Sequence, residues 1–223
     1  MQTLLTLEVR WFEPGKIPNN VEQWFTTACP GELSGAAEER EDQYFYTPGC
    51  DALNLKLRRG KLELKWRQTE IGIYSFDVKN WRGRVERWLK WSYQESIPDR
   101  LIQALGTGDK PVVTIGKKRW QRHHRGVECE LTQLRFDRSK FWWSLGFEME
   151  ETQTREKNHF QQVVNQVIKT YPETAFNTVH SHAYPSWLLE QVFAANPPDE
   201  SHLPSSSKIN NLSERQNDNN SND

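Results

Sequence analysis

The stretch EREDQYFYTPGCDALNLKLRRGKLELKWRQ, residues 39–68, decides the fold because much of it alternates apolar and charged residues with a period of two. Leucine side chains fall on one face, and lysine, arginine and glutamate side chains fall on the other. Arg59 and Gly60 separate two such runs, 53–58 and 61–67. A two-residue loop between alternating runs predicts a tight β-hairpin, here with one heavily charged face.

The two-residue loop also fixes which residues of the hairpin face one another. It places Lys56 opposite Glu63, a favourable cross-strand pair, and Arg58 opposite Lys61, a pair of like charges that costs stability. A charged strand face is ordinarily a solvated outer face. The inner wall of a barrel that binds an anion has the same pattern, because inward charges are costly unless a partner or a ligand neutralises them. The hairpin by itself leaves both interpretations open.

The same alternation recurs along the chain and predicts eight strands, at residues 5–12, 40–47, 53–58, 61–67, 83–93, 111–120, 126–136 and 140–151. Of these, the run at 83–93 suits a helix as well. Charged residues two positions apart mark one face of most of the strands. Eight strands close into a barrel with room for side chains or one small ligand. We therefore expect an α+β fold in which an eight-stranded antiparallel β-barrel forms a tunnel covered by a few helices.

Helical spacing of apolar residues predicts the covering helices at residues 18–28, 97–106, 154–172 and 184–195. Residues 196–223 are polar and nearly free of large apolar side chains, a composition typical of a disordered segment. The sequence therefore predicts one tunnel-barrel domain over residues 1–195 and a disordered polar tail over residues 196–223.

The overall charge and the cysteines restrict the class of protein. Among 223 residues, 29 Lys and Arg nearly balance 30 Asp and Glu, so the formal net charge is −1. That balance argues against bulk electrostatic attraction to nucleic acid or to an anionic membrane, although it permits a local basic pocket. The three cysteines have no metal-ligand spacing, and no apolar run is long enough for a signal peptide or a membrane span. We expect a cytoplasmic protein with neither a nucleic-acid nor a membrane partner.

Several short motifs follow one another along the chain: TLEVR (6–10), YFYTP (44–48), LKLR (55–58), LELK (62–65), ECELT (128–132) and GFEME (146–150). In this order they resemble the strands of the triphosphate tunnel metalloenzymes, the CYTH superfamily. There an acidic-basic opening strand precedes an aromatic stretch with a basic strand, a lysine strand and two late carboxylate strands. The resemblance runs from Leu5 to Glu151.

The resemblance implies a ligand and a chemistry. Members of that family hold a triphosphate with Lys and Arg side chains inside the tunnel, and carboxylates there bind Mg²⁺ or Mn²⁺. The implied reaction is hydrolysis of the terminal phosphoryl group of a small triphosphate, which needs positioning and charge neutralisation more than covalent help. The phosphate-binding residues would be Arg10, Lys56, Arg58, Lys65, Arg67 and Lys118. The metal ligands would be Glu8, Glu148 and Glu150, with Glu128 and Glu130 as catalytic carboxylates that bind metal or orient water.

Three residues depart from the family pattern. Thr6 replaces the first glutamate of the opening motif, Arg10 replaces its lysine, and Thr132 stands where an acidic residue is common. Loss of a carboxylate weakens a metal site, and Arg in place of Lys keeps the charge but changes the hydrogen-bond geometry. Three functions therefore stay open: a metal-dependent phosphohydrolase of small triphosphates, a barrel that binds a phosphorylated ligand or a protein without turnover, and a charged sheet without a tunnel that serves as an interaction module.

Overall fold

The computed structural model of the chain describes residues 2–45, 49–76, 80–92, 112–136, 140–152 and 157–195. The chain divides into two compact units, Met1–Glu190 and Gln191–Asp223. All strands of the described residues belong to the first unit. The expected helix at 97–106 and the expected disordered tail at 196–223 lie outside the described residues, so both stay predictions.

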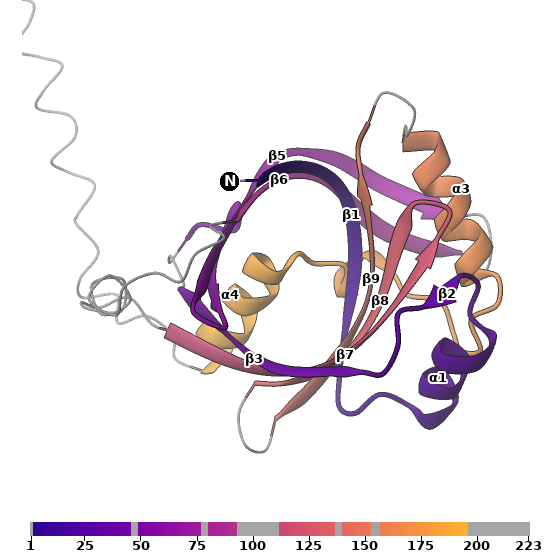
Figure 1. The fold of residues 1–223 in the computed structure, drawn as a ribbon, viewed down its shortest axis with the longest axis horizontal. Helices are drawn as coiled ribbons and strands as arrows, with labels where there is room; N and C mark the ends of the chain where they lie inside the picture. Colours follow the sequence, from indigo (N-terminus) through magenta and orange to yellow (C-terminus); the bar gives the residue numbers. More distant parts are fainter. Residues whose placement is uncertain are drawn as a thin grey trace, which may run out of the picture. The chain divides into compact units, whose positions relative to one another are not determined.

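The strands form one antiparallel sheet that closes on itself (Figure 1). They are β1 (Gln2–Pro14), β2 (Glu32–Leu33), β3 (Glu38–Phe45), β4 (Leu53–Arg58), β5 (Lys61–Phe76), β6 (Trp81–Ser92), β7 (Val112–His124), β8 (Val127–Arg135) and β9 (Phe141–Glu150). All except the short β2 close in the order β7-β3-β4-β5-β6-β1-β9-β8 and back to β7. This confirms the predicted eight-stranded antiparallel barrel and excludes the open charged sheet without a tunnel.

The hairpin that decides the fold has the predicted register. β4 and β5 pair with the like-charged Arg58 and Lys61 directly opposite one another. The loop residues Arg59 and Gly60 have φ angles of 50° and 75°. Two-residue hairpin loops favour this left-handed conformation because it matches the twist of the flanking strands.

Two strands differ from what the pattern predicts. β5 continues to Phe76, well beyond the predicted end at residue 67, and it pairs with β6 through two register shifts within residues 67–72. Bulges of this kind interrupt the period-two alternation, so the sequence concealed the second half of the strand. The ambiguous run at 83–93 is a strand and forms most of β6.

Two of the helices that the structure describes pack against the outside of the barrel, where the strands present apolar side chains. The third packs its Trp187 and Leu188 against residues of the inward face, among them Phe12 and Ile115. The helices are α1 (Asn19–Gln23), which continues as a π-helical turn (Trp24–Ala28), α3 (Lys157–Ile168) and α4 (Tyr184–Ala195). α3 ends at Ile168, before the predicted end at residue 172, and buries its apolar stripe from Phe160 to Ile168. No helix among the described residues has the length and apolar character that crossing a membrane requires.

The main hydrophobic core lies on the outer face of the barrel. Trp11 of β1 is fully buried there, and its ring packs against the rings of Phe76, Trp81, Phe147 and Phe176. Aromatic side chains bury large apolar areas. Because apolar residues of β1, β6, β8 and β9 face this outer core, the residues at alternate positions of these strands, many of them charged, face the interior of the barrel.

Candidate functional site

The inward side chains enclose a cavity of about 90 Å³, which is room for several water molecules. Nine cationic side chains line it: Arg10, Arg40, Lys56, Arg58, Lys65, Arg84, Lys90, Lys117 and Arg119. Five carboxylates line it as well: Glu8, Glu63, Glu86, Glu130 and Glu148. With all of these groups ionised, and with the buried Asp42 behind them included, nine cations face six carboxylates, an excess of three positive charges, although the whole chain has a net charge of −1.

The structure brings together seven of the residues that the sequence predicts for the site: Glu8, Arg10, Lys56, Arg58, Lys65, Glu130 and Glu148. Four predicted residues do not line the cavity: Arg67, Lys118, Glu128 and Glu150. Lys118 is exposed on the outer face of β7, where its Nζ lies 4.9 Å from the centroid of the Trp120 ring. Strand alternation instead turns its neighbours Lys117 and Arg119 into the cavity.

The other three residues are Arg67, Glu128 and Glu150. Arg67 and Glu128 pair with other described side chains, and Glu150 does not. Arg67 binds both carboxylate oxygens of Asp51 at 2.9 Å. Glu128 lies 2.7 Å from Nδ1 of the exposed His123. Glu150 is exposed and makes no hydrogen bond or ion pair with any residue that the structure describes.

Asp42 of β3 organises the cationic side of the cavity. Its side chain has no exposure to solvent, and its oxygens lie near four cations: 3.1 Å from Arg40 Nε, 3.1 Å from Arg58 Nε, 3.3 Å from Lys117 Nζ and 3.7 Å from Lys56 Nζ. Burial alone would raise the pKa of Asp42, but the surrounding cations outweigh burial and hold this pKa well below its ordinary value. One buried carboxylate thus holds together cations from three strands.

Two of these cations are lysines whose charge changes near neutral pH. Burial, helped by the positive charge of Arg58, lowers the pKa of Lys56 to about 7. Burial also lowers the pKa of Lys117 to about 7. Lys117 Nζ donates a hydrogen bond of 2.6 Å to the hydroxyl of Tyr44, and burial raises the pKa of Tyr44 well above its ordinary value. The cavity wall therefore gains positive charge as the pH falls through about 7.

Gly146 allows a second charged pair to form across the wall. β1, β9 and β8 lie side by side, with Arg10 opposite Gly146 and Gly146 opposite Glu130. Arg10 Nη1 passes over Gly146 and donates to Glu130 at 2.8 Å and to Ser144 Oγ at 3.0 Å. Burial alone would raise the pKa of Glu130, but Arg10 and Arg119 hold it well below its ordinary value.

Replacing Gly146 with Ala should disrupt this pair. A Cβ atom at residue 146 would lie 2.6 Å from Cζ of Arg10, so the guanidinium would have to move away from Glu130. We expect the free energy of unfolding to fall by about 1 to 3 kcal/mol, measured by urea denaturation. An Arg10→Met chain has no guanidinium to displace, so there the same substitution should cost much less. Equal losses in the two backgrounds would contradict this interpretation.

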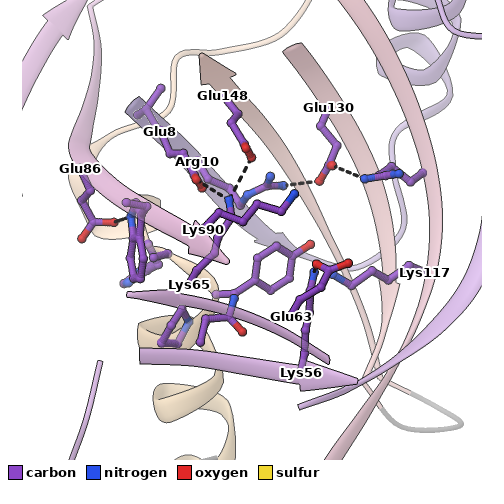
Figure 2. A pocket seen from close by; sticks show the side chains of 18 of the residues that line it. Glu8, Arg10, Lys56, Glu63, Lys65, Glu86, Lys90, Lys117, Glu130 and Glu148 are labelled. Carbon is purple, nitrogen blue, oxygen red and sulfur yellow. Dashed lines mark hydrogen bonds and ion pairs between the residues drawn. The ribbon is translucent and has the colours of Figure 1, made fainter. Parts of the chain in front are cut away.

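Lys65 of β5 joins two of the carboxylates that were predicted to bind a metal ion (Figure 2). Its Nζ forms ion pairs with Glu8 and with Glu148, the second at 3.1 Å. Thr6 Oγ1 donates a hydrogen bond of 2.8 Å to Glu8. Burial alone would lower the pKa of Lys65, but Glu148 and Glu8 outweigh burial and hold this pKa above its ordinary value.

As arranged, these carboxylates do not fit a divalent metal ion. The Lys65 ammonium already bridges Glu8 and Glu148, and the third predicted ligand, Glu150, does not line the cavity. Within the described ranges, no group of three or more His, Cys, Asp and Glu side chains is placed to hold a metal ion. Mg²⁺ and Mn²⁺ bind through several oxygen ligands, so the geometry does not support the expected metal site.

The first turn of α4 closes one end of the cavity with aromatic rings. Lys117 Nζ lies 3.8 Å from the centroid of the Tyr184 ring, and Arg10 Cζ lies 5.0 Å from it. Such cation–π contacts stabilise a positive charge without neutralising it. Trp187 stacks on Phe12 of β1 with the ring centroids 4.7 Å apart. The charged wall therefore gives way to an aromatic and apolar end.

Sequence reasoning missed part of this wall, namely Arg40, Glu63, Arg84, Glu86, Lys90, Lys117, Arg119 and Tyr184, and the buried Asp42 and Tyr44 next to it. Most of these lie two residues from another inward residue on the same strand. Strict alternation along the predicted hairpin would have found Glu63, because it lies on the same face of β5 as Lys61 and Lys65. Tyr184 comes from a helix, and no strand pattern could have placed it.

Solved structures include several of similar fold. A conserved hypothetical protein from Pyrococcus furiosus matches with a TM-score of 0.50 and 16% identity, over 81% of this chain and 98% of that one. A putative adenylate cyclase from Bacillus halodurans matches with a TM-score of 0.41 and 13% identity, over 74% and 90%. The S. pombe Pct1 RNA triphosphatase matches with a TM-score of 0.43 and 11% identity, over 78% and 86%. No protein-family profile and no curated protein sequence matches the chain.

These similarities are at the level of fold. The chain has the closed antiparallel barrel with a charged interior that the order of the motifs predicted. Because the sequence identities are low, the chemistry of this chain has to be argued from its own residues.

Proposed function

We propose that the barrel binds a small triphosphate, or another short polyphosphate anion, in its interior. The observation that carries the proposal is the excess of positive charge around the cavity of a chain whose net charge is −1. Cations gathered inside a barrel repel one another and lose hydration, which costs folding free energy. A bound polyanion would offset that cost.

The arrangement of the cations suits an elongated anion. They project from different sides of the wall: Arg10 from β1, Lys56 and Arg58 from β4, and Lys117 from β7. Arginine offers a planar fork of donors and lysine a compact ammonium, and both bind phosphate oxygens well. Lys90 of β6 lines the cavity and makes no hydrogen bond or ion pair with any residue that the structure describes, so it is available to a ligand.

Binding must also open existing ion pairs. Lys56 lies 3.2 Å from Glu63, and Arg10 lies 2.8 Å from Glu130. A phosphate group that binds these cations replaces a carboxylate as their partner, so the affinity reflects the difference between the two sets of contacts. Because the cations outnumber the carboxylates, the ligand fills a deficit of negative charge that the protein cannot fill itself.

Inorganic triphosphate should stabilise the folded chain. At a concentration about 100 times the dissociation constant, a ligand that binds the native state alone adds about 2.7 kcal/mol. For a chain of this size that corresponds to a rise of roughly 5 to 10 °C in the melting temperature, measured by differential scanning fluorimetry. Sodium chloride at matched ionic strength should give a much smaller rise.

Two variants separate a site in the barrel from a general effect of the anion. Lys56→Met removes a cation from the cavity wall and should reduce the shift, whereas Lys169→Met removes an exposed cation after α3 and should leave it unchanged. A shift no larger than the salt control, or equal shifts in both variants and the wild type, would count against the proposal.

A second candidate function is hydrolysis of the bound triphosphate. It is favoured by Lys117, which has a pKa of about 7, contacts Tyr44 and lines the cavity. A base whose pKa lies near the working pH is suited to accepting a proton from an attacking water. Release of phosphate from inorganic triphosphate, ATP or thiamine triphosphate, measured with EDTA and with Mg²⁺ or Mn²⁺, would support a phosphohydrolase. Binding without release would support a barrel that binds only.

A further inference from the structure

Four carboxylates form a row across four neighbouring strands. In the β1–β6 pair Glu8 lies opposite Glu86, in the β1–β9 pair it lies opposite Glu148, and in the β8–β9 pair Glu148 lies opposite Glu128. Like charges directly opposed on adjacent strands destabilise a sheet. The row therefore requires positive charge, and a divalent cation held by carboxylate oxygens would be one way to supply it.

The two outer members of the row have separate partners. Glu86 accepts a hydrogen bond from Arg67 Nη1 at 2.8 Å and another from Trp88 Nε1 at 3.1 Å. Glu128 lies 2.7 Å from Nδ1 of His123. These contacts leave the two central carboxylates, Glu8 and Glu148, as the pair that still needs a cation between them.

Lys65 supplies that cation from a strand that is not adjacent to either carboxylate. It belongs to β5, which β6 separates from β1, so its side chain reaches over β6 to Glu8 and Glu148 (Figure 2). The Lys65 side chain is only 16% exposed, which shows how closely the neighbouring groups surround it. Lys90 faces Lys65 directly in the β5–β6 pair, yet it forms no ion pair with Glu8 or Glu148. The position between the two carboxylates is therefore specific to Lys65.

We propose that the Lys65 ammonium takes the place of a divalent metal ion between Glu8 and Glu148, so that the tunnel binds triphosphate without metal. This inference rests on the proposed function, because it adds that the site binds its triphosphate without a metal ion. A divalent ion at this position would have to displace Lys65 or share two carboxylates with its positive charge. A tethered ammonium instead offsets half the charge of the two carboxylates while the remaining cations of the wall stay available for phosphate oxygens.

Titration of Mn²⁺ alone tests the position of Lys65 directly. The electron paramagnetic resonance signal of free Mn²⁺ should change little on addition of the wild-type chain. Lys65→Met leaves Glu8 and Glu148 facing one another without a cation, and this variant should bind Mn²⁺ at least tenfold more tightly than the wild type. Lys90→Met removes the same charge from the directly opposed position but leaves Lys65 between Glu8 and Glu148, so it should gain much less Mn²⁺ affinity than Lys65→Met.

Three outcomes of this titration would overturn the inference. The first is binding by the wild type as tight as binding by Lys65→Met. The second is no gain of binding in a Lys65→Met chain whose circular dichroism shows it to be folded. The third is an equal gain in Lys90→Met, which would mean that the tunnel responds to overall charge and not to the place of Lys65.

A second measurement uses the wild-type chain and so does not depend on how a variant folds. The rise in melting temperature caused by inorganic triphosphate should be at least as large in EDTA as in Mg²⁺, because Mg²⁺ cancels part of the charge on the ligand. A rise that appears only with metal would overturn the inference and leave the proposed function intact. No rise in either condition would count against the proposed function, and the Mn²⁺ titration would still decide the role of Lys65.

Discussion

Asp42→Asn should lower the melting temperature of the free protein by roughly 10 °C. The substitution keeps the shape of the side chain but removes the buried charge that lies within 3.7 Å of four cations. Removing one member of a buried ionic network costs about 3 to 5 kcal/mol, because the charges left behind have no compensation. One kcal/mol corresponds to a shift of about 2 to 4 °C for a chain of this length. Thermal unfolding followed by circular dichroism measures the change.

The tunnel account also predicts that a polyanion rescues this variant. Inorganic triphosphate supplies the missing negative charge, so it should raise the melting temperature of Asp42→Asn by more than it raises that of the wild type. Asp51→Asn is the matched control, because Asp51 is 46% exposed and pairs with Arg67 near the surface. Exposed ion pairs contribute about 0 to 1 kcal/mol, so this control should lose little. An Asp42→Asn chain as stable as the control would contradict the account.

Triphosphate binding should weaken by at least about tenfold between pH 7 and pH 9. Lys56 and Lys117 have pKa values of about 7 in the free protein. A bound polyanion favours the charged ammonium, so binding above pH 7 must take up protons and becomes less favourable as the pH rises. Calorimetric titrations in buffers of different ionisation enthalpy measure the proton uptake directly. A Lys56→Met chain should take up fewer protons, and an uptake equal to that of the wild type would contradict the assignment.

The free protein should show the opposite pH dependence. The pKa of each lysine is lowered from 10.5 to about 7 in the folded chain. Between these two values the unfolded chain binds more protons than the folded chain, so this contribution to stability rises with pH. We therefore expect the melting temperature of the free chain to increase from pH 7 to pH 9 while the stabilisation by triphosphate decreases. If both quantities changed in the same direction, the buried lysines could not be the cause.

The barrel could be predicted because the features that indicate it lie within short stretches of sequence. A two-residue loop fixes the register of the hairpin, and period-two alternation then sorts the side chains of β4 and β5 into an apolar and a charged face. Repetition of that pattern on other strands leaves few architectures besides a closed sheet. The second half of β5 could not be predicted, because its bulges remove the alternation on which the reasoning depends.

β7 shows why the sequence pointed to Lys118, whereas Lys117 is the residue that lines the cavity. Its inward face mixes the apolar Ile115 with Lys117, and its outward face mixes the apolar Trp120 with Lys118 and Arg122. Neither face is purely apolar, so the pattern gives no reason to prefer Lys117 over Lys118. Only the pairing with the neighbouring strands settles the choice.

The ion pairs of Asp42 and Lys65 could not be predicted from the sequence, for a different reason. Asp42 lies in the acidic run of residues 38–42 and looks like a solvated residue until β3, β4 and β7 bring their cations around it. Lys65 meets Glu8 and Glu148 only because the sheet curves, which brings the inward side chains of β5, β1 and β9 together over the intervening β6. Contacts between strands that are not neighbours depend on the curvature of the whole sheet, and no local pattern encodes them.

The central claim is that the interior of the barrel binds a triphosphate. Isothermal titration calorimetry of inorganic triphosphate into the wild-type chain, at pH 6 and in EDTA, tests this most directly, because Lys56 and Lys117 are charged at that pH. The account predicts saturable binding of a single triphosphate per chain, which Lys56→Met weakens and Lys169→Met leaves unchanged. Heats no larger than those of dilution, or heats that sodium chloride of matched ionic strength reproduces, would contradict it.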